Sequence, residues 1–187
     1  MTNTPTYRAL LWLPNTVTIT RLLAGLLLFA FISYDGQING WRLACFVAIA
    51  LTDWVDGWLA RKINAHTGWG QLLDPIADKV VLLFAFGYFY FTGDITVWFT
   101  LLYFIRELLQ TAIRIVFFSR NKSDQTPTLF ISKLKTALSY LYVILLFAEQ
   151  VPGYWPGIVR PAFVHFLFEV IIIVLSYAGF IKPFLKK

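Results

Sequence analysis

The sequence predicts an all-α integral membrane protein with six membrane-spanning helices and a short interfacial helix before the first. Of its 187 residues, 58% are hydrophobic and only 14% are charged, whereas soluble domains average about 45–50% apolar and about 25% charged residues. The apolar residues gather in six stretches, each long enough to cross a hydrocarbon core of about 30 Å as a helix. Because six spans leave little chain for anything else, we expect residues 1–187 to form a single membrane domain.

Turn-forming residues separate the six stretches, which run over residues 16–34, 41–61, 71–92, 95–118, 131–149 and 161–182. The breaks are rich in Gly, Pro, Asn and Asp, which favour turns. In the first stretch Arg21 interrupts the apolar run, and Ser33-Tyr34-Asp35 is a poor cleavage site. We therefore expect this stretch to be a retained helix rather than a signal peptide.

The basic residues at the stretch ends predict how the chain lies in the membrane. We expect the segment from Tyr7 to Pro14 to form the interfacial helix. This helix would end at the proline and hold Arg8 and Trp12 at headgroup level. Most other basic residues outside the spans fall on the same side as Arg8: Lys62, Arg120, Lys122, Lys186 and Lys187. The positive-inside rule then places both termini in the cytoplasm. Since no Arg- and Ser-rich presequence precedes the first stretch, we expect a bacterial cytoplasmic membrane.

The formal net charge of +6 calls for an anionic partner. A nucleic-acid-binding protein would carry a continuous basic face with interleaved aromatic residues, and none is visible. The basic residues lie mostly at helix ends instead, which favours anionic membrane lipids or an anionic substrate. We therefore expect no nucleic-acid partner.

Four of the ten acidic residues fall inside otherwise apolar stretches: Asp53, Asp56, Asp74 and Asp78. A charge at the bilayer centre costs at least about 2.5–3.5 kcal/mol, so such residues are candidates for function. The alternative is simple solvation near helix ends. Spacings of three and four place each pair on one helix face, and the short 62–69 connection makes the two helices antiparallel neighbours. Four carboxylates are thus expected to converge near the cytoplasmic side.

Converging carboxylates require a cation between them, and a set of oxygen ligands favours Mg²⁺ or Mn²⁺, with two ions for four acids. Small residues surround the acids, together with one arginine: Gly57, Ala60, Gly70 and Arg61. Small residues allow close helix packing, but they equally allow a bulky ligand to approach the backbone. Metal, arginine and small residues together predict a diphosphate site.

The complete pattern is Asp53-x2-Asp56-Gly57-x2-Ala60-Arg61-x8-Gly70-x3-Asp74-x3-Asp78. It resembles the signature of the CDP-alcohol phosphatidyltransferase family at every position. The runs Leu73 to Lys79 and Leu13-Pro14-Asn15-x2-Thr18-x2-Arg21 are also similar to this family. The likeness covers nearly the whole chain.

The resemblance implies a two-metal phosphotransferase that releases CMP from a CDP-linked lipid, CDP-diacylglycerol. It implies that Asp53, Asp56 and Asp74 are metal ligands, and that Asp78 is both a ligand and the general base. It further implies a CDP pocket formed by Asn15, Thr18, Asp53, Gly57, Ala60, Arg61 and Gly70. A homodimer is implied as well.

The molecule that accepts the phosphatidyl group is inferred from the remaining basic residues within the apolar stretches, which are Arg106, Arg114, Lys133 and Lys135. A basic cluster suits an acceptor that carries its own phosphate, although Lys133 could equally snorkel to headgroups. We expect Glu107 to pair with one of these bases. The Arg106-Glu107-x6-Arg114 and Lys133-x-Lys135 patterns are similar to the group of this family that transfers the phosphatidyl group to sn-glycerol 3-phosphate, making phosphatidylglycerol phosphate.

Two alternatives stay open. The run from Pro127 to Lys133 has some likeness to the cardiolipin-forming group of the family, whose acceptor is phosphatidylglycerol. From a different class, intramembrane acids could form the ion path of a divalent-cation transporter, which would distribute carboxylates across the membrane depth. A lipid-binding scaffold is weaker because it needs no metal site. CMP release separates the enzyme from both. His165 and Glu169 have no role assigned from the sequence.

Overall fold

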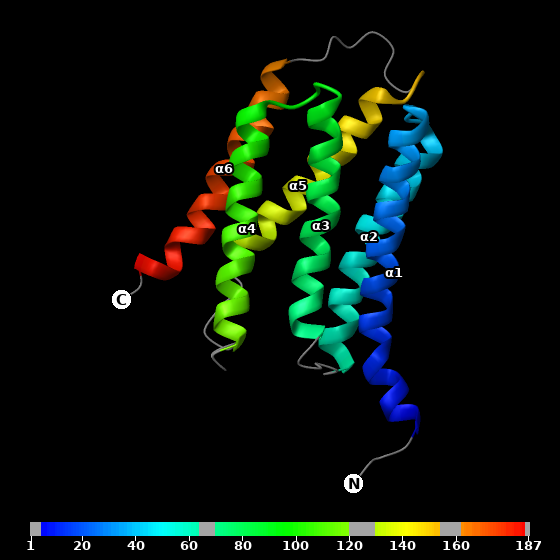
Figure 1. Cartoon of the computed structure of the whole chain (residues 1–187), viewed down its shortest axis with the longest axis vertical. Helices are drawn as coiled ribbons and strands as arrows, with labels where there is room; N and C mark the ends of the chain where they lie inside the picture. Colours follow the sequence, from blue (N-terminus) through cyan, green and yellow to red (C-terminus); the bar gives the residue numbers. More distant parts are fainter. Residues whose placement is uncertain (1–4, 64–69, 120–129, 154–161, 186–187) are drawn as a thin grey trace. The chain divides into compact units, whose positions relative to one another are not determined.

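The computed structural model describes the backbone of residues 5–63, 70–119, 130–153 and 162–185. Its side chains are described at residues 16, 19–52, 79–113, 115, 131–153 and 162–178. These residues form six helices and no strand: α1 (Pro5–Asp35), α2 (Gly40–Ile63), α3 (Gly70–Phe91), α4 (Val97–Ser119), α5 (Phe130–Gln150) and α6 (Ala162–Leu185) (Figure 1). The all-α prediction and the six helical stretches are confirmed.

The prediction of a separate interfacial helix is wrong, because α1 continues through Pro14 as one helix from Pro5 to Asp35. A proline inside a helix lacks one N–H and so removes one backbone hydrogen bond. A break at this point would instead leave up to four N–H and four C=O groups without helical partners. Where the surroundings are apolar, continuing the helix costs less than ending it.

The chain divides into two compact units, residues 1–84 and 85–187, with the boundary inside α3. In the first unit α1 packs against α2, where the rings of Phe29 and Phe46 meet edge to face with centroids 6.1 Å apart. Beyond the end of α1, Arg42 of α2 donates hydrogen bonds to Asp35 and to the carbonyl of Gln37. The hydrogen bond from Arg42 lowers the pKa of the Asp35 carboxyl.

Gly25 allows α1 to approach α3 within the first unit. A Cβ atom built on Gly25 would lie 3.0 Å from Cγ2 of Val81, closer than ordinary van der Waals contact. Valine in a helix is held in one preferred χ1 rotamer and cannot easily turn away. The missing side chain of Gly25 therefore sets the distance between these two helices.

Aromatic rings form the core of the second unit. The Phe86 ring lies at the centre, with ring centroids 5.0 Å from Phe99 and 4.8 Å from Tyr103, both nearly perpendicular to it. From α5, Tyr142 stacks on Phe168 of α6 with a centroid distance of 5.4 Å. Edge-to-face and offset contacts of this kind are the favourable geometries for aromatic pairs. They join α3, α4, α5 and α6 in one core.

A tight turn links α3 to α4. Gly93 has a φ of 82°, a left-handed conformation that glycine adopts without strain. The N–H of Asp94 donates to the carbonyl of Phe89 and that of Gly93 to Tyr90, which is the Schellman pattern. Thr96 then caps α4, since its Oγ1 accepts a hydrogen bond from the N–H of Phe99. The turn thus ends one helix and starts the next within five residues.

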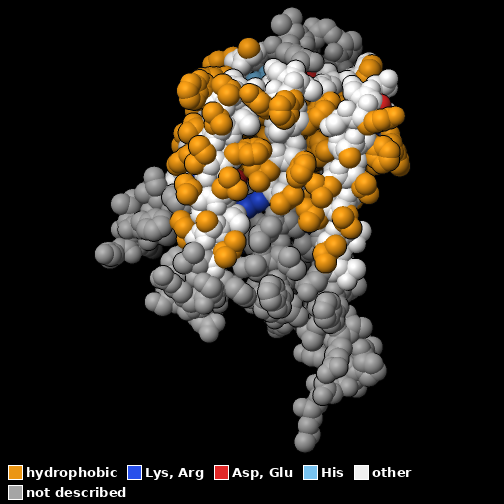
Figure 2. Space-filling model, viewed as in Figure 1, with side chains coloured by type: hydrophobic (Ala, Val, Ile, Leu, Met, Phe, Trp, Pro, Cys, Tyr) orange, Lys and Arg blue, Asp and Glu red, His pale blue; other side chains and the backbone are white. Residues whose placement is uncertain are grey.

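Large hydrophobic side chains cover much of the outer surface of the described helices (Figure 2). On α1 they recur every four residues, at Ile19, Leu23, Leu27 and Phe31, each about half exposed or more. On α6 the exposed set includes Phe163, Phe166, Leu167, Val170, Ile171 and Val174. A soluble monomer rarely exposes contiguous apolar surface of this extent, so the surface suits lipid.

By length and composition, one described helical segment could cross a membrane, Ile131–Gln150, with 20 residues and a mean hydropathy of 1.4. Three shorter apolar helical segments are also found in the described part of the chain: Gly40–Thr52, Lys79–Phe91 and Ala162–Ala178. Six membrane spans therefore stay a prediction from the sequence.

We expect Gly25→Ala to lower the free energy of unfolding by about 1 kcal/mol, because overpacking against Val81 outweighs the helix propensity gained from alanine. Thermal unfolding of the purified protein in detergent measures the change. Gly87→Ala is the matched control, since a Cβ at Gly87 would meet only Cζ of Phe104, at 3.9 Å. Equal stabilisation by both substitutions would contradict the proposed close contact.

Candidate functional site

The predicted metal and CDP residues lie on the helices of the first unit. Asp53, Asp56, Gly57, Ala60 and Arg61 belong to α2, Gly70, Asp74 and Asp78 to α3, and Asn15 and Thr18 to α1. Because both aspartate pairs are in helices, the spacings of three and four keep each pair on one helix face. The side chains of all ten residues lie outside the described part of the structure. Among the described side chains, no group of three or more His, Cys, Asp or Glu could hold a metal ion.

A buried cluster of three charges lies in the second unit. Oε1 of Glu107 on α4 accepts a hydrogen bond from Nη1 of Arg106 and another from Nζ of Lys135 on α5, each at 2.5 Å. The side chains of Arg106 and Glu107 are each 1% exposed, and that of Lys135 is 5% exposed. The pairing expected for Glu107 is confirmed, and it involves two bases instead of one. Among the described residues, two basic side chains thus share one carboxylate oxygen.

The guanidinium of Arg106 is only partly satisfied by the protein. Its Nε donates to the main-chain carbonyl of Ser176 on α6 at 3.1 Å, and Nη1 is bonded to Glu107. Its Nη2 is buried and has no hydrogen-bond partner among the described residues. A buried charged donor without a partner is costly, and an anionic ligand oxygen would remove that cost.

The ring of Tyr103 lies beside the cluster, with Nζ of Lys135 at 5.2 Å from its centroid. The negative face of an aromatic ring stabilises a nearby ammonium group. One turn further along α5, Ser139 donates to the carbonyl of Lys135 at 2.9 Å. Lys135 is therefore held by contacts from α4 as well as its own helix.

The other two predicted acceptor residues differ from this pair. Lys133 lies in the first turn of α5, two residues before Lys135, and its side chain is exposed. Residues two apart on a helix do not share a face, which explains why one lysine is exposed and the other buried. Arg114 lies on α4, and its side chain is outside the described part. The structure thus brings together Arg106 and Lys135 through Glu107.

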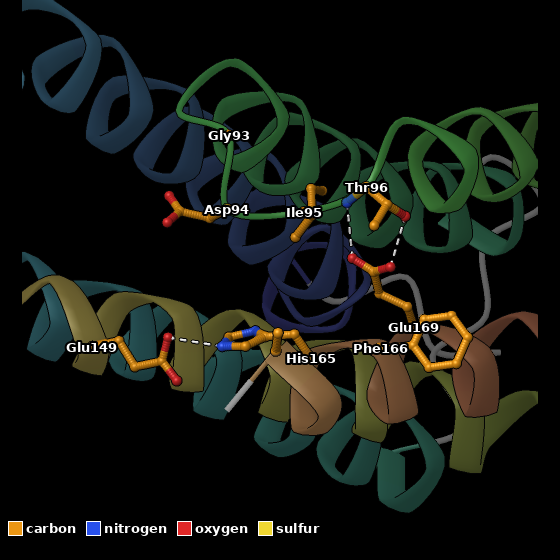
Figure 3. A pocket seen from close by; sticks show the side chains of 9 residues that line it. Gly93, Asp94, Ile95, Thr96, Glu149, His165, Phe166 and Glu169 are labelled. Atoms are coloured by element: carbon orange, nitrogen blue, oxygen red, sulfur yellow. Dashed lines mark hydrogen bonds and ion pairs between the residues drawn. The ribbon is translucent and has the colours of Figure 1, made fainter. Parts of the chain in front are cut away.

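A second polar region surrounds the α3–α4 turn, at a cavity of about 300 Å³ (Figure 3). Glu169 on α6 accepts hydrogen bonds from the N–H of Thr96 at 2.9 Å and from its Oγ1 at 2.7 Å. Nε2 of His165 lies 3.1 Å from Oε2 of Glu149 on α5. Asp94 accepts from Thr92 and from Gln150. Each carboxylate at the cavity has a partner in the chain, so these groups connect helix ends.

Sequence reasoning assigned no role to His165 and Glu169. The partner of Glu169 lies 73 positions away in the sequence, at Thr96, and that of His165 lies on the preceding helix, at Glu149. No local spacing pattern could reveal such a pair. Only the intramembrane acidic character of Glu169 marked it as unusual.

A sequence profile of the CDP-alcohol phosphatidyltransferase family matches residues 11–180. The chain belongs to this family. The match takes in part or all of each of the six helices and the whole aspartate motif on α2 and α3. The resemblance inferred from the motif is confirmed, and the protein is an enzyme of the phosphatidyltransferase class.

The relatives of this phosphatidyltransferase described here carry the names of two different enzymes. A protein of Wigglesworthia glossinidia brevipalpis is 32% identical over 146 residues, covering 74% of this chain and 78% of the relative, and is named CDP-diacylglycerol–glycerol-3-phosphate 3-phosphatidyltransferase. A Bacillus subtilis protein of the same name is 30% identical over 107 residues, covering 57% of this chain and 54% of the relative. A putative cardiolipin synthase of Mycobacterium tuberculosis is 30% identical over 131 residues, covering 70% and 62%.

We expect Glu169→Gln to lower the free energy of unfolding by about 1–3 kcal/mol, because the two donors of Thr96 lose a charged acceptor in a buried setting. Thermal unfolding in detergent measures this loss. Thr96→Val should give a similar loss, and the double variant should lose less than the sum of the two. Additive losses would contradict a direct bond between these residues.

Proposed function

We propose that this family member transfers the phosphatidyl group of CDP-diacylglycerol to the 1-hydroxyl of sn-glycerol 3-phosphate, yielding phosphatidylglycerol phosphate and CMP. The complete aspartate motif and the family match support phosphatidyl transfer. Relatives named for the use of glycerol 3-phosphate support this acceptor. The observation that carries the acceptor assignment is the buried pair of bases, in which Nη2 of Arg106 has no hydrogen-bond partner among the described residues.

We assign Asp53, Asp56, Asp74 and Asp78 as the ligands of two Mg²⁺ or Mn²⁺ ions. The donor set consists of carboxylate oxygens alone, which fits these hard cations and disfavours zinc or copper. When bound, the ions neutralise the diphosphate and stabilise the departing CMP.

The protein's own residues complete the reaction. Asp78 accepts the proton of the acceptor hydroxyl while the hydroxyl oxygen bonds to the phosphorus that carries diacylglycerol. The bond from that phosphorus to the CMP oxygen breaks, and CMP leaves. Arg61 pairs with the diphosphate, and the small residues Gly57, Ala60 and Gly70 leave room for the nucleotide, with Asn15, Thr18 and Asp53 as further CDP-binding residues.

The acceptor's phosphate is assigned to the basic residues Arg106, Arg114, Lys133 and Lys135. Glycerol 3-phosphate carries a dianionic phosphate at neutral pH, and guanidinium groups bind such oxygens with directed hydrogen bonds. The two buried bases of the cluster support this assignment, as does Nη2 of Arg106, which has no hydrogen-bond partner among the described residues.

We further propose six membrane spans in a bacterial cytoplasmic membrane, with both termini and the active site on the cytoplasmic side and a homodimeric assembly. The exposed apolar side chains along the described helices support a lipid environment. The distribution of basic residues supports the orientation.

A second candidate is cardiolipin synthesis, with phosphatidylglycerol as the acceptor. The similarity to the mycobacterial putative cardiolipin synthase favours it. Phosphatidylglycerol also carries a phosphate that a basic cluster could bind. The family match favours either reaction over a divalent-cation transporter.

Supplying the detergent-purified protein with CDP-diacylglycerol and Mg²⁺ or Mn²⁺ tests the proposal. Labelled glycerol 3-phosphate and phosphatidylglycerol are offered separately, and CMP and lipid products are followed. Metal-dependent phosphatidylglycerol phosphate is the expected product. Cardiolipin from phosphatidylglycerol alone would replace the acceptor and keep the transfer chemistry.

We expect Asp78→Asn to abolish turnover while much of the CDP-diacylglycerol binding remains, because an amide cannot take the hydroxyl proton. A loss of 10²-fold or more in kcat is the expected scale for a general base. CMP release measures kcat, and titration with CDP-diacylglycerol measures binding. Asp35→Asn, which changes an exposed acid paired with Arg42, is the matched control and should keep full activity.

We expect Arg114→Ala chiefly to raise the apparent KM for glycerol 3-phosphate, by about tenfold or more if one charged hydrogen bond of about 1.5–3 kcal/mol is lost. Initial rates at varied acceptor concentration measure this change. Arg42→Ala removes an arginine outside the proposed site and should leave the KM unchanged. If Arg114→Ala also left it unchanged, the acceptor's phosphate would have to bind elsewhere.

A further inference from the structure

We propose that Glu107 is a positioning residue for the acceptor: it holds Arg106 and Lys135 in the orientation in which they bind the acceptor's phosphate. This inference rests on the proposed function, in which these two bases contact the acceptor. Glu107 itself carries a negative charge that would repel phosphate, so its contribution acts through its two partners.

The geometry of Arg106 depends on Glu107. A guanidinium group is planar and rigid, so fixing two of its nitrogens determines the direction of the third. Nε is fixed by the carbonyl of Ser176 at 3.1 Å and Nη1 by Oε1 of Glu107 at 2.5 Å. The remaining nitrogen, Nη2, is the one without a partner among the described residues. Glu107 and Ser176 together therefore aim the free donor.

The closeness of the two bases also depends on Glu107. Nη1 of Arg106 and Nζ of Lys135 both lie 2.5 Å from the same carboxylate oxygen, so they are at most about 5 Å apart. Two cations at this distance in a buried setting repel each other strongly unless an anion lies between them. Without the carboxylate, one base would have to move away from the other.

The charge balance distinguishes this cluster from a purely structural ion pair. Among the described residues, the cluster pairs two basic side chains with one carboxylate, and Nη2 of Arg106 is buried without a hydrogen-bond partner. Glu169, the other buried glutamate of the second unit, has its carboxylate bonded to both donors of Thr96 and faces no such surplus. A surplus of buried positive charge points to an anionic ligand.

The test compares Glu107→Gln, Glu107→Asp and Lys135→Gln with the unchanged enzyme, measuring kcat and the KM of each substrate. Glu107→Gln should raise the KM for glycerol 3-phosphate about tenfold or more and leave the KM for CDP-diacylglycerol within about twofold. Glu107→Asp, which keeps the charge, should recover part of the loss. Glu169→Gln is the control matched for burial, and it should lower thermal stability without changing either KM.

A double variant separates positioning from general stabilisation. If Glu107 acts through Lys135, Glu107→Gln with Lys135→Gln should bind glycerol 3-phosphate no worse than Lys135→Gln alone, within about twofold. Independent effects would multiply instead. Multiplying effects, or an unchanged acceptor KM in a folded and active Glu107→Gln enzyme, would overturn the inference. If Glu107→Gln does not fold, an unchanged acceptor KM in Glu107→Asp overturns it equally.

The experiments distinguish an error in the proposed acceptor from an error in the proposed role of Glu107. An unchanged enzyme that makes only cardiolipin would refute the proposed acceptor, and the same variants would then be measured with phosphatidylglycerol. A raised KM for that acceptor would keep the positioning role. Absence of CMP release with both acceptors would overturn the two proposals together.

Discussion

Oε1 of Glu107 is the point on which the polar interior of the second unit depends. That one atom joins α4 to α5 through Lys135, and it fixes the arginine that reaches the main chain of α6. Around it the unit is built from aromatic rings, which cannot accept strong hydrogen bonds from charged groups. Where apolar residues fill the interior and also cover the outside, a charged side chain has to find its partner inside the protein. The positions of the three helices follow from that requirement.

The same requirement explains the polar contacts around the α3–α4 turn of the second unit. Glu169, Glu149 and Asp94 are each bonded to a group from another helix or from the α3–α4 turn. These contacts provide an acceptor for the N–H of Thr96 at the start of α4, and they link α5 and α6 to this region. The carboxylates around the turn all have partners in the chain, whereas Nη2 of Arg106 has no hydrogen-bond partner among the described residues.

The sequence predicted most of the fold because apolar stretches and turn residues are local signals. The six predicted helices agree with the observed bounds to within a few residues, apart from the N-terminal extension of α1. That extension was missed because a proline was read as an end, although a helix in apolar surroundings keeps more hydrogen bonds by continuing. Spacing in the sequence also identified the aspartate motif and hence the family. The partners of Glu169 and His165 could not be predicted, because they depend on contacts between different helices.

The residues proposed to bind the acceptor were predicted only in part. Arg106 and Lys135 stand out in the sequence as charges within apolar stretches, and so does Glu107. The sequence alone cannot show that one carboxylate oxygen of Glu107 accepts hydrogen bonds from both bases. Nor can it show that Lys133 is exposed while Lys135 is buried. Helical periodicity separates the two lysines only once the buried face of α5 is known.

In the proposed arrangement of six membrane spans, the buried cluster also bears on how the chain would enter a bilayer during synthesis. α4 alone carries Arg106 and Glu107 near its middle, and each charge opposes insertion by about 2.5–3.5 kcal/mol at the bilayer centre. The lysine that shares Glu107 arrives only with α5, which contains a segment long and apolar enough to cross a membrane, Ile131–Gln150. Insertion of α4 and α5 as a hairpin would let the charges neutralise one another before either helix meets lipid alone. A contact that we propose to orient a substrate in the mature enzyme would thus also determine the order in which its helices enter the membrane.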